Sequence, residues 1–197
     1  RNVKKAQTLG LISLVFILLS ATCSEVYLPK PKGFNRIDMP VADYQSLQDT
    51  FPYHFQYSKY ANISRDTFHL AGRYWINLNY SDYGALVQLT YKNLRSPSND
   101  INLLLDDAYE LSARHNIKAY SIEESILSIQ NGQKASVIEL EGEVPSQFQF
   151  FTTDTTNHFL RGALYFNVAD KNDSLSPIIE FIKADVIQML NTLEWKY

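Results

Sequence analysis

Residues 118–167 read KAYSIEESILSIQNGQKASVIELEGEVPSQFQFFTTDTTNHFLRGALYFN. The Asn131-Gly132 pair favours a hairpin because both residue types tolerate positive φ, and Pro145 and the polar cluster at 154–157 mark two further turns. Strands that are joined by such short turns run antiparallel. The stretch therefore predicts four consecutive antiparallel strands, rich in β-branched and aromatic residues, at 118–129, 135–144, 148–153 and 159–167.

Three earlier segments also have strand character. Residues 74–80 and 85–91 are β-rich runs separated by a short polar loop, which predicts a hairpin. Residues 51–57 alternate aromatic side chains with polar or small ones, as in a half-buried strand or an extended edge segment.

Apolar residues at helical spacing predict two helices. The first follows N-cap candidates at 98–100 and runs to about residue 116. The second has Ser176 as its N-cap and Pro177 in its first turn, and its apolar face ends at Leu193. The order of elements predicts a single α+β domain, a curved antiparallel sheet of about six strands flanked by helices. This order is similar to that of the PsbP/Mog1-like sandwich, an analogy that carries no function.

The N-terminal region has the pattern of an export signal. Three cations precede a short apolar stretch at 9–19, whose eleven residues would span only about 16 Å as a helix, roughly half of a bilayer core. Residues 1–22 are therefore predicted to be a signal peptide that is cleaved before Cys23, the only cysteine, which would carry the lipid of a lipoprotein. The alternative is an N-terminal membrane anchor with an incidental buried cysteine.

Residues 23–50 are predicted to be a proline-rich tether that carries the globular domain, residues 51–197. Three prolines between 27 and 40 favour extended backbone. Lys30, Lys32 and Arg36 make this tether basic, and they are candidates for contact with a partner or with anionic lipid, or else belong to a solvated spacer.

The charge of the mature chain argues against a nucleic-acid partner. The whole chain has 18 Lys and Arg against 21 Asp and Glu, and residues 1–22 hold three of the cations and no acid. Cleavage before Cys23 therefore leaves a formal charge of −6. An exported domain of this charge is a poor binder of DNA or RNA.

The sequence contains no motif for catalysis or for a cofactor. It has no glycine-rich phosphate loop, nucleophile elbow, HExxH motif or cysteine pair. The four histidines fall in separate predicted elements without metal-ligand spacing: His54, His69, His115 and His158. We therefore expect no enzyme activity, no metal site, no cofactor and no small-molecule substrate.

Two groups of side chains are candidates for binding. Glu139, Glu141 and Glu143 share one face of a predicted strand, where they could contact a partner, hold a cation or act as an acid/base pair, or form a solvated face balanced by a cation such as Arg161. The second group is aromatic and could form a protein-binding patch, a stacking surface for glycans, or the edges of the core: Tyr53, Tyr57, Tyr60, Tyr74, Trp75, Tyr80 and Tyr83.

Several longer stretches of the sequence are typical of one protein family. They are Tyr-Leu-Pro-Lys-Pro-Lys-Gly-Phe at 27–34, Tyr-Trp-Ile-Asn-Leu at 74–78, Ile-Lys-Ala-Tyr-Ser-Ile-Glu-Glu at 117–124, Glu-Leu-Glu-Gly-Glu-Val-Pro-Ser-Gln-Phe-Gln-Phe at 139–150 and Asn-Thr-Leu-Glu-Trp at 191–195. In these runs the chain resembles the GldD family of gliding-motility lipoproteins from Bacteroidota. The likeness extends over essentially all of the mature chain.

The resemblance implies a lipoprotein of the cell envelope that gliding requires and that is linked to type IX secretion. It places the lipid, such as palmitate, on Cys23 and transfers no catalytic residue. Ser24 and a single nearby acid, Glu25, favour the outer membrane and its periplasmic face. We therefore predict a non-catalytic accessory protein or adaptor that binds gliding and secretion proteins of the envelope. The alternative is a peptidoglycan- or glycan-binding module, or a small periplasmic hydrolase.

Overall fold

A computed structural model describes residues 38–48, 50–68, 70–113, 119–129, 132–142, 144–167 and 172–196. The chain divides into two compact units, 1–34 and 35–197, and every described residue belongs to the second. The predicted signal peptide, Cys23, the basic residues of the tether (Lys30, Lys32 and Arg36) and Glu143 all lie outside the described residues.

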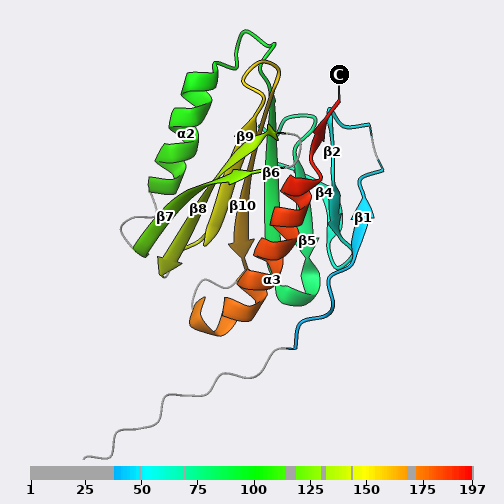
Figure 1. Cartoon of the computed structure of the whole chain (residues 1–197), viewed down its shortest axis with the longest axis vertical. Helices are drawn as coiled ribbons and strands as arrows, with labels where there is room; N and C mark the ends of the chain where they lie inside the picture. The colour runs from blue at the N-terminus through cyan, green and yellow to red at the C-terminus, as the bar shows by residue number, and fades with distance from the viewer. Residues whose placement is uncertain are drawn as a thin grey trace, which may run out of the picture. The chain divides into compact units, whose positions relative to one another are not determined.

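The second unit is built on a seven-stranded sheet in which every neighbouring pair is antiparallel (Figure 1). The last four strands form the predicted meander, and the β5–β6 hairpin joins it because β6 pairs with β10. The strands lie in the order β4 (Asn62–Arg65), β5 (Ile76–Tyr80), β6 (Ala85–Asn93), β10 (His158–Phe166), β9 (Phe148–Thr153), β8 (Lys134–Gly142) and β7 (Ala119–Ser128). The predicted α+β class with an antiparallel sheet is confirmed.

The segment predicted as one strand at 51–57 is divided in the structure. β2 (Tyr53–His54) pairs with β11 (Glu194–Trp195), and β3 (Gln56–Ser58) pairs with β1 (Tyr44–Ser46), so neither belongs to the main sheet. Strand β4, which the sequence analysis did not predict, takes the edge position beside β5. A short 3-10 helix, η1 (Ser81–Tyr83), forms the turn between β5 and β6.

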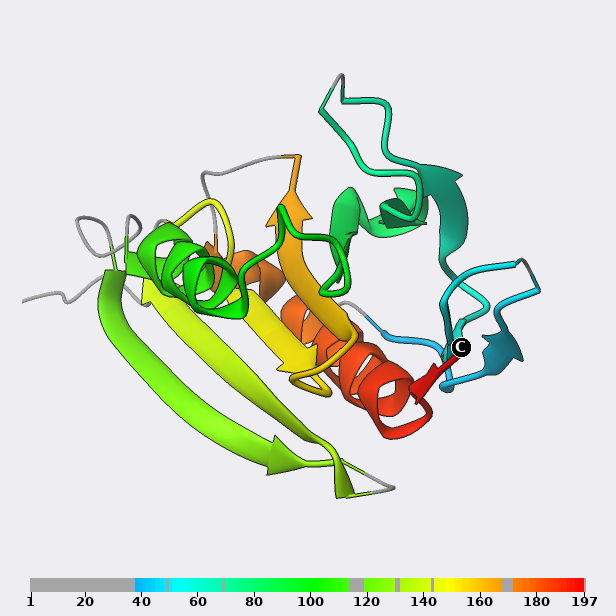
Figure 2. The same ribbon diagram turned by 90° about the horizontal axis from the view of Figure 1, so that it is seen from above.

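Two helices cover opposite faces of the sheet (Figure 2). Neighbouring residues of a strand point to opposite faces, so Phe150 joins the main core beneath α3 (Asn172–Asn191), while Phe151 packs with Ala108 of α2 (Ile101–Ala113). The main core is the larger cluster and contains apolar residues of β5, β6, β9, β10 and α3.

Helix α3 begins earlier than predicted, at Asn172, so Pro177 lies inside the helix rather than in its first turn. A proline at the sixth position removes the hydrogen bond to the carbonyl four residues before it, and its ring crowds that carbonyl. Packing of Ile178 and Ile182 against the sheet stabilises the helix across this position.

Candidate functional site

The predicted acidic face lies on the side of the sheet that α3 covers. Glu139 is opposite Phe148 of β9, a residue of the main core, and its Oε2 atom is 2.6 Å from Nζ of Lys183 on α3. Glu141 shares this face, is exposed and has no ion-pair partner among the described residues. Glu123 of β7 lies directly opposite Glu139 in the register and is also exposed.

Lys183 is the cation that balances this face. Burial lowers the pKa of Lys183, but its hydrogen bonds to Glu139 and Glu180 outweigh that effect and hold the pKa above its ordinary value. The prediction that Arg161 plays this part is wrong. Arg161 lies on β10 opposite Phe151, so it points to the α2 face, where its Nη2 donates to Oε1 of Gln149 at 2.8 Å.

Strand β7 forms one outer margin of the sheet (Figure 2). It pairs with β8 on one side, and no described strand pairs with its other side. Three large apolar side chains are exposed along it: Tyr120 at 78%, Ile122 at 41% and Ile126 at 68%. We name the exposed side chains of Tyr120, Ile122, Glu123 and Ile126 the β7 edge surface.

Glu124 lies between the two isoleucines and is held by its neighbours. Its Oε1 atom accepts hydrogen bonds from the hydroxyl of Tyr109 on α2, at 2.9 Å, and from Oγ of Ser136 on β8, at 2.7 Å. Burial raises the pKa of the Tyr109 phenol, and the bond to Glu124 raises it further, so this phenol stays a donor. These bonds tie α2 to the outer strands and keep β7 in place.

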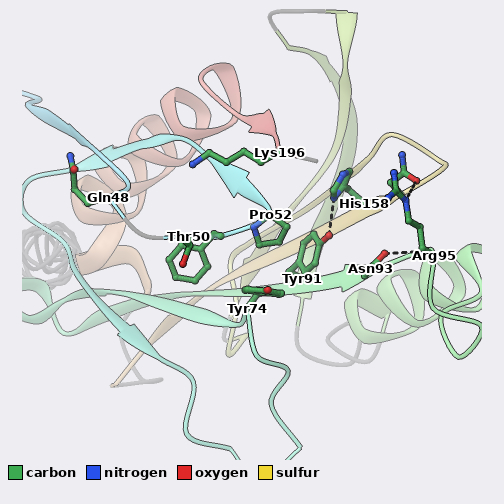
Figure 3. A pocket seen from close by; sticks show the side chains of 11 residues that line it. Gln48, Thr50, Pro52, Tyr74, Tyr91, Asn93, Arg95, His158 and Lys196 are labelled. Atoms are coloured by element: carbon green, nitrogen blue, oxygen red, sulfur yellow. Dashed lines mark hydrogen bonds between the residues drawn. The ribbon is translucent and has the colours of Figure 1, made fainter.

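A second candidate site is a cavity of about 620 Å³ that we name the Tyr74 cavity (Figure 3). Its aromatic lining consists of Phe51, Tyr74 and Tyr91, and the rings of Tyr74 and Tyr91 are nearly perpendicular, at 84°, with centroids 5.9 Å apart. Its polar lining includes the side chains of Gln48, Asn93, Arg95, Asn157 and Lys196.

The loop between β9 and β10 supplies one end of this cavity. Oδ1 of Asp154 accepts backbone hydrogen bonds from Thr156, Asn157 and His158 at 2.7 to 3.0 Å. Burial alone would raise the pKa of Asp154, but these bonds lower it below its usual value. The bonds also fix the backbone of Asn157. Its side-chain Oδ1 accepts a hydrogen bond from Nε of Arg95 at 2.7 Å.

His158 lies at the same end of the cavity and is buried. Its Nδ1 atom is 2.8 Å from the hydroxyl of Tyr91, and Trp195 stacks on the ring with centroids 5.0 Å apart. Burial lowers the pKa of His158, which outweighs the opposing effect of Asp154, so the imidazole is neutral near pH 7. Burial also raises the pKa of Tyr91 to about 12. Tyr91 and His158 therefore form a hydrogen bond between two uncharged side chains.

The predicted aromatic surface does not form. Tyr53 and Tyr80 are buried in the main core, which agrees with the alternative that these aromatic residues belong to the core. Tyr74 lines the Tyr74 cavity, whereas Trp75 lines a different one on the α2 face. The rings of Tyr60 and Tyr83 pack against Phe181 of α3. The aromatic residues are thus divided among several environments.

Sequence reasoning did not find the Tyr74 cavity, because its lining comes from distant parts of the chain. Residues 51–52, 74, 91–95, 157–158 and 196 meet only when β2 pairs with β11 and β6 pairs with β10. The one local signal was the polar cluster at 154–157, which we interpreted as a turn alone. Across the described part of the chain, no group of three His, Cys, Asp or Glu side chains is placed to hold a metal ion.

Comparison with protein families gives a match over residues 24–195 to gliding motility lipoprotein GldD. The chain belongs to the GldD family. A role in gliding motility and attachment to an envelope membrane as a lipoprotein follow from this membership. Within the described ranges of this GldD-family chain, no helix is long and apolar enough to cross a membrane. Comparison with curated proteins gives no match.

Among solved structures, the GldD-family chain is similar to cyanobacterial PsbP (CyanoP) from Synechocystis sp. PCC 6803. The sequence identity is 12%, the TM-score is 0.45, and the match covers 79% of this chain and 94% of that one.

Proposed function

We propose that this GldD-family chain is a non-catalytic adaptor of the gliding apparatus, linked to type IX secretion, that binds an envelope protein through its β7 edge surface. The supporting observation is the long outer margin of β7. The strand has ten residues, from Ala119 to Ser128; among the described strands it pairs only with β8, and three of its large apolar side chains are exposed. An unpaired strand edge of this kind accepts an added strand from another protein.

The opposite edge of the sheet is less suited to this task. Strand β4 has four residues, and three of them, Asn62, Ser64 and Arg65, are exposed and polar. An added strand on β4 would therefore gain few backbone hydrogen bonds and little apolar contact. The length and the exposed isoleucines of β7 favour it as the docking edge.

The charge beside β7 indicates the chemistry of the partner. Glu123 and Glu141 are exposed and form no ion pair with a described residue, and Lys183 is already bound to Glu139 and Glu180. A strand placed along β7 would contact Glu123 and Glu141 on the α3 face of the sheet. On the α2 face it would contact Ile122 and Ile126. The fitting partner is an extended segment with Lys or Arg on one face and apolar residues on the other.

The remaining parts of the proposal concern the membrane. Cys23 carries the lipid after removal of residues 1–22, the tether follows it, and the domain lies on the periplasmic face of the outer membrane. Support comes from the export pattern, from Ser24 and Glu25, and from a family match that begins at residue 24. Lys30, Lys32 and Arg36 lie near the membrane in this arrangement and supply a second contact, with anionic lipid or with the partner.

The test is a pair of matched substitutions in the native gene. Ile126→Lys places a cation within the β7 edge surface, whereas Leu103→Lys makes the same change on α2 at a residue of similar exposure, 63% against 68%. We expect Ile126→Lys to abolish spreading on agar and to remove a crosslink from a photoreactive residue at position 123, with the protein at its normal level. The Leu103→Lys strain should retain both the spreading on agar and the crosslink.

Two results contradict this proposal. Normal gliding and an unchanged crosslink in the Ile126→Lys strain exclude docking along β7. Loss of the crosslink only when Lys30, Lys32 and Arg36 are replaced by Gln assigns the contact to the tether instead.

A further inference from the structure

The Tyr74 cavity has an aromatic wall against which a sugar ring can pack. Tyr74 is partly exposed, and the buried rings of Tyr91 and Phe51 support it, with centroids 5.9 and 6.3 Å from its own (Figure 3). Aromatic faces of this kind pack against the apolar C–H faces of pyranose rings, while the amides of Asn93 and Asn157 lie within reach of hydroxyl groups. The volume of about 620 Å³ falls within the range of small-molecule sites, about 300 to 1,000 Å³.

The described residues of the lining carry a positive charge although the chain is acidic. Arg95 and Lys196 line the cavity, and no carboxylate does so among the described residues. The nearby acid Asp154 is turned into its own loop by three backbone hydrogen bonds. An anion in the cavity would therefore meet two cations and no described acid, a combination that favours negatively charged ligands.

Arg95 is held in a fixed orientation. Its Nε donates to Oδ1 of Asn157 at 2.7 Å, and its backbone N–H donates to Oδ1 of Asn93 at 3.0 Å. The two terminal nitrogens of the guanidinium have no hydrogen-bond partner among the described residues. A planar guanidinium held in this way is suited to a bidentate bond with a carboxylate.

We propose that the Tyr74 cavity binds an acidic sugar, with the ring against Tyr74 and its carboxylate on Arg95. Lys196 supplies the second positive charge, and its backbone N–H donates to the carbonyl of Pro52 at 2.8 Å, which fixes the backbone from which its side chain extends. We assign binding alone to this site and no cleavage step. This site is separate from the β7 edge surface, so either proposal can fail without the other.

The test measures binding of digalacturonic acid to the full-length lipoprotein in detergent by isothermal titration calorimetry. We expect a Kd below about 1 mM and no measurable binding of the neutral galactose disaccharide. Arg95→Gln should weaken binding at least about 10-fold, because a charge-assisted bond is lost. Lys134→Gln is the matched control, an exposed cation on β8 outside the cavity, and should leave the Kd unchanged.

A second substitution tests the aromatic wall. Tyr74→Leu keeps apolar volume but removes the ring face, and should weaken binding about 10-fold or more while the fluorescence of Trp75 and Trp195 reports an intact fold. N-Acetylmuramic acid is titrated in parallel, and tighter binding of this compound than of digalacturonic acid would point to the cell wall as the source. Equal binding of the neutral sugar, an unchanged Kd in Arg95→Gln, or no binding of either acid overturns the proposal.

Discussion

Gly162 allows β9 and β10 to pack in the main core. A Cβ atom at this position would lie 2.2 Å from two atoms of the Phe150 ring and 3.0 Å from Leu89. Phe150 is only 1% exposed and is enclosed by the core, so its ring has little room to move. We expect Gly162→Ala to lower the free energy of unfolding by about 1 to 3 kcal/mol, measured by urea unfolding.

The paired variant Gly162→Ala with Phe150→Leu separates the clash from other effects. Leucine removes the ring atoms that the new methyl would meet, so part of the lost stability should return. If the alanine costs the same beside leucine, contact with Phe150 is not its cause.

Asp185 is a carboxyl group inside the main core, on α3 and 2% exposed. Burial raises its pKa, and the nearby hydroxyls of Ser58, Tyr44 and Tyr80 only partly oppose this; the Tyr80 hydroxyl donates to Oδ2 at 3.2 Å. In the unfolded chain the group titrates near pH 3.9. The folded state thus keeps its proton to higher pH, and the contribution of Asp185 to stability is lost as pH rises from about 4 through the raised pKa.

Asp185→Asn should remove this pH dependence. The stability of the variant relative to the natural chain is expected to increase from pH 4 to pH 7, by about 1.4 kcal/mol for each unit by which folding raises the pKa. Urea unfolding at a series of pH values, followed by the fluorescence of Trp75 and Trp195, measures the difference. A flat difference would show that Asp185 is ionised as readily in the folded state as in the unfolded one, and a difference that falls with pH would show that it is ionised more readily.

At the scale of elements, the loop between β9 and β10 depends on one side chain. Oδ1 of Asp154 accepts three backbone hydrogen bonds, and Thr155 within the loop has a φ of 63°, which is uncommon for a residue other than glycine. We expect Asp154→Ala to destabilise the protein by about 1 to 2 kcal/mol and to speed amide hydrogen exchange at 156–158. Asp154→Asn keeps the acceptor oxygen and should restore most of the protection. Slow exchange in the alanine variant would show that the loop is held by other contacts.

Elements whose contacts are local in the chain were predictable from the sequence, and those whose contacts join distant segments were not. The meander from β7 to β10 was predictable because its pairing is set by short turns such as the one at Gly132, whose φ is 75°. The pairing of β2 with β11 joins segments about 140 residues apart, and the contact of Lys183 with Glu139 joins a helix to a strand. No local pattern encodes such contacts. For the same reason the acids of β8 were predictable as one face, but the cation that balances them was not.

At the scale of the whole molecule, the charge of the domain and its attachment act together. The residues after the predicted signal peptide have a formal charge of −6, while Lys30, Lys32 and Arg36 give the tether a local positive charge. Anionic lipid headgroups would attract the basic tether and repel the acidic domain. A lipid on Cys23, as we propose, would therefore hold the domain near the membrane although the surface charge of the domain opposes binding.

Replacement of Cys23 tests this arrangement. Cys23→Ala removes the only thiol of the chain, so it should abolish labelling by radioactive palmitate and prevent cleavage of residues 1–22. Since each buried CH₂ of an acyl chain contributes about 0.8 kcal/mol, the loss of two or three chains should abolish stable anchoring by lipid. In a variant that also carries a cleavable signal peptide for export without lipid, the domain should move from the membrane fraction to the periplasm, and gliding should stop. Labelling that persists without Cys23 would contradict lipid attachment at this residue. Gliding by the unlipidated form would show that binding to the partner alone keeps the domain at the membrane.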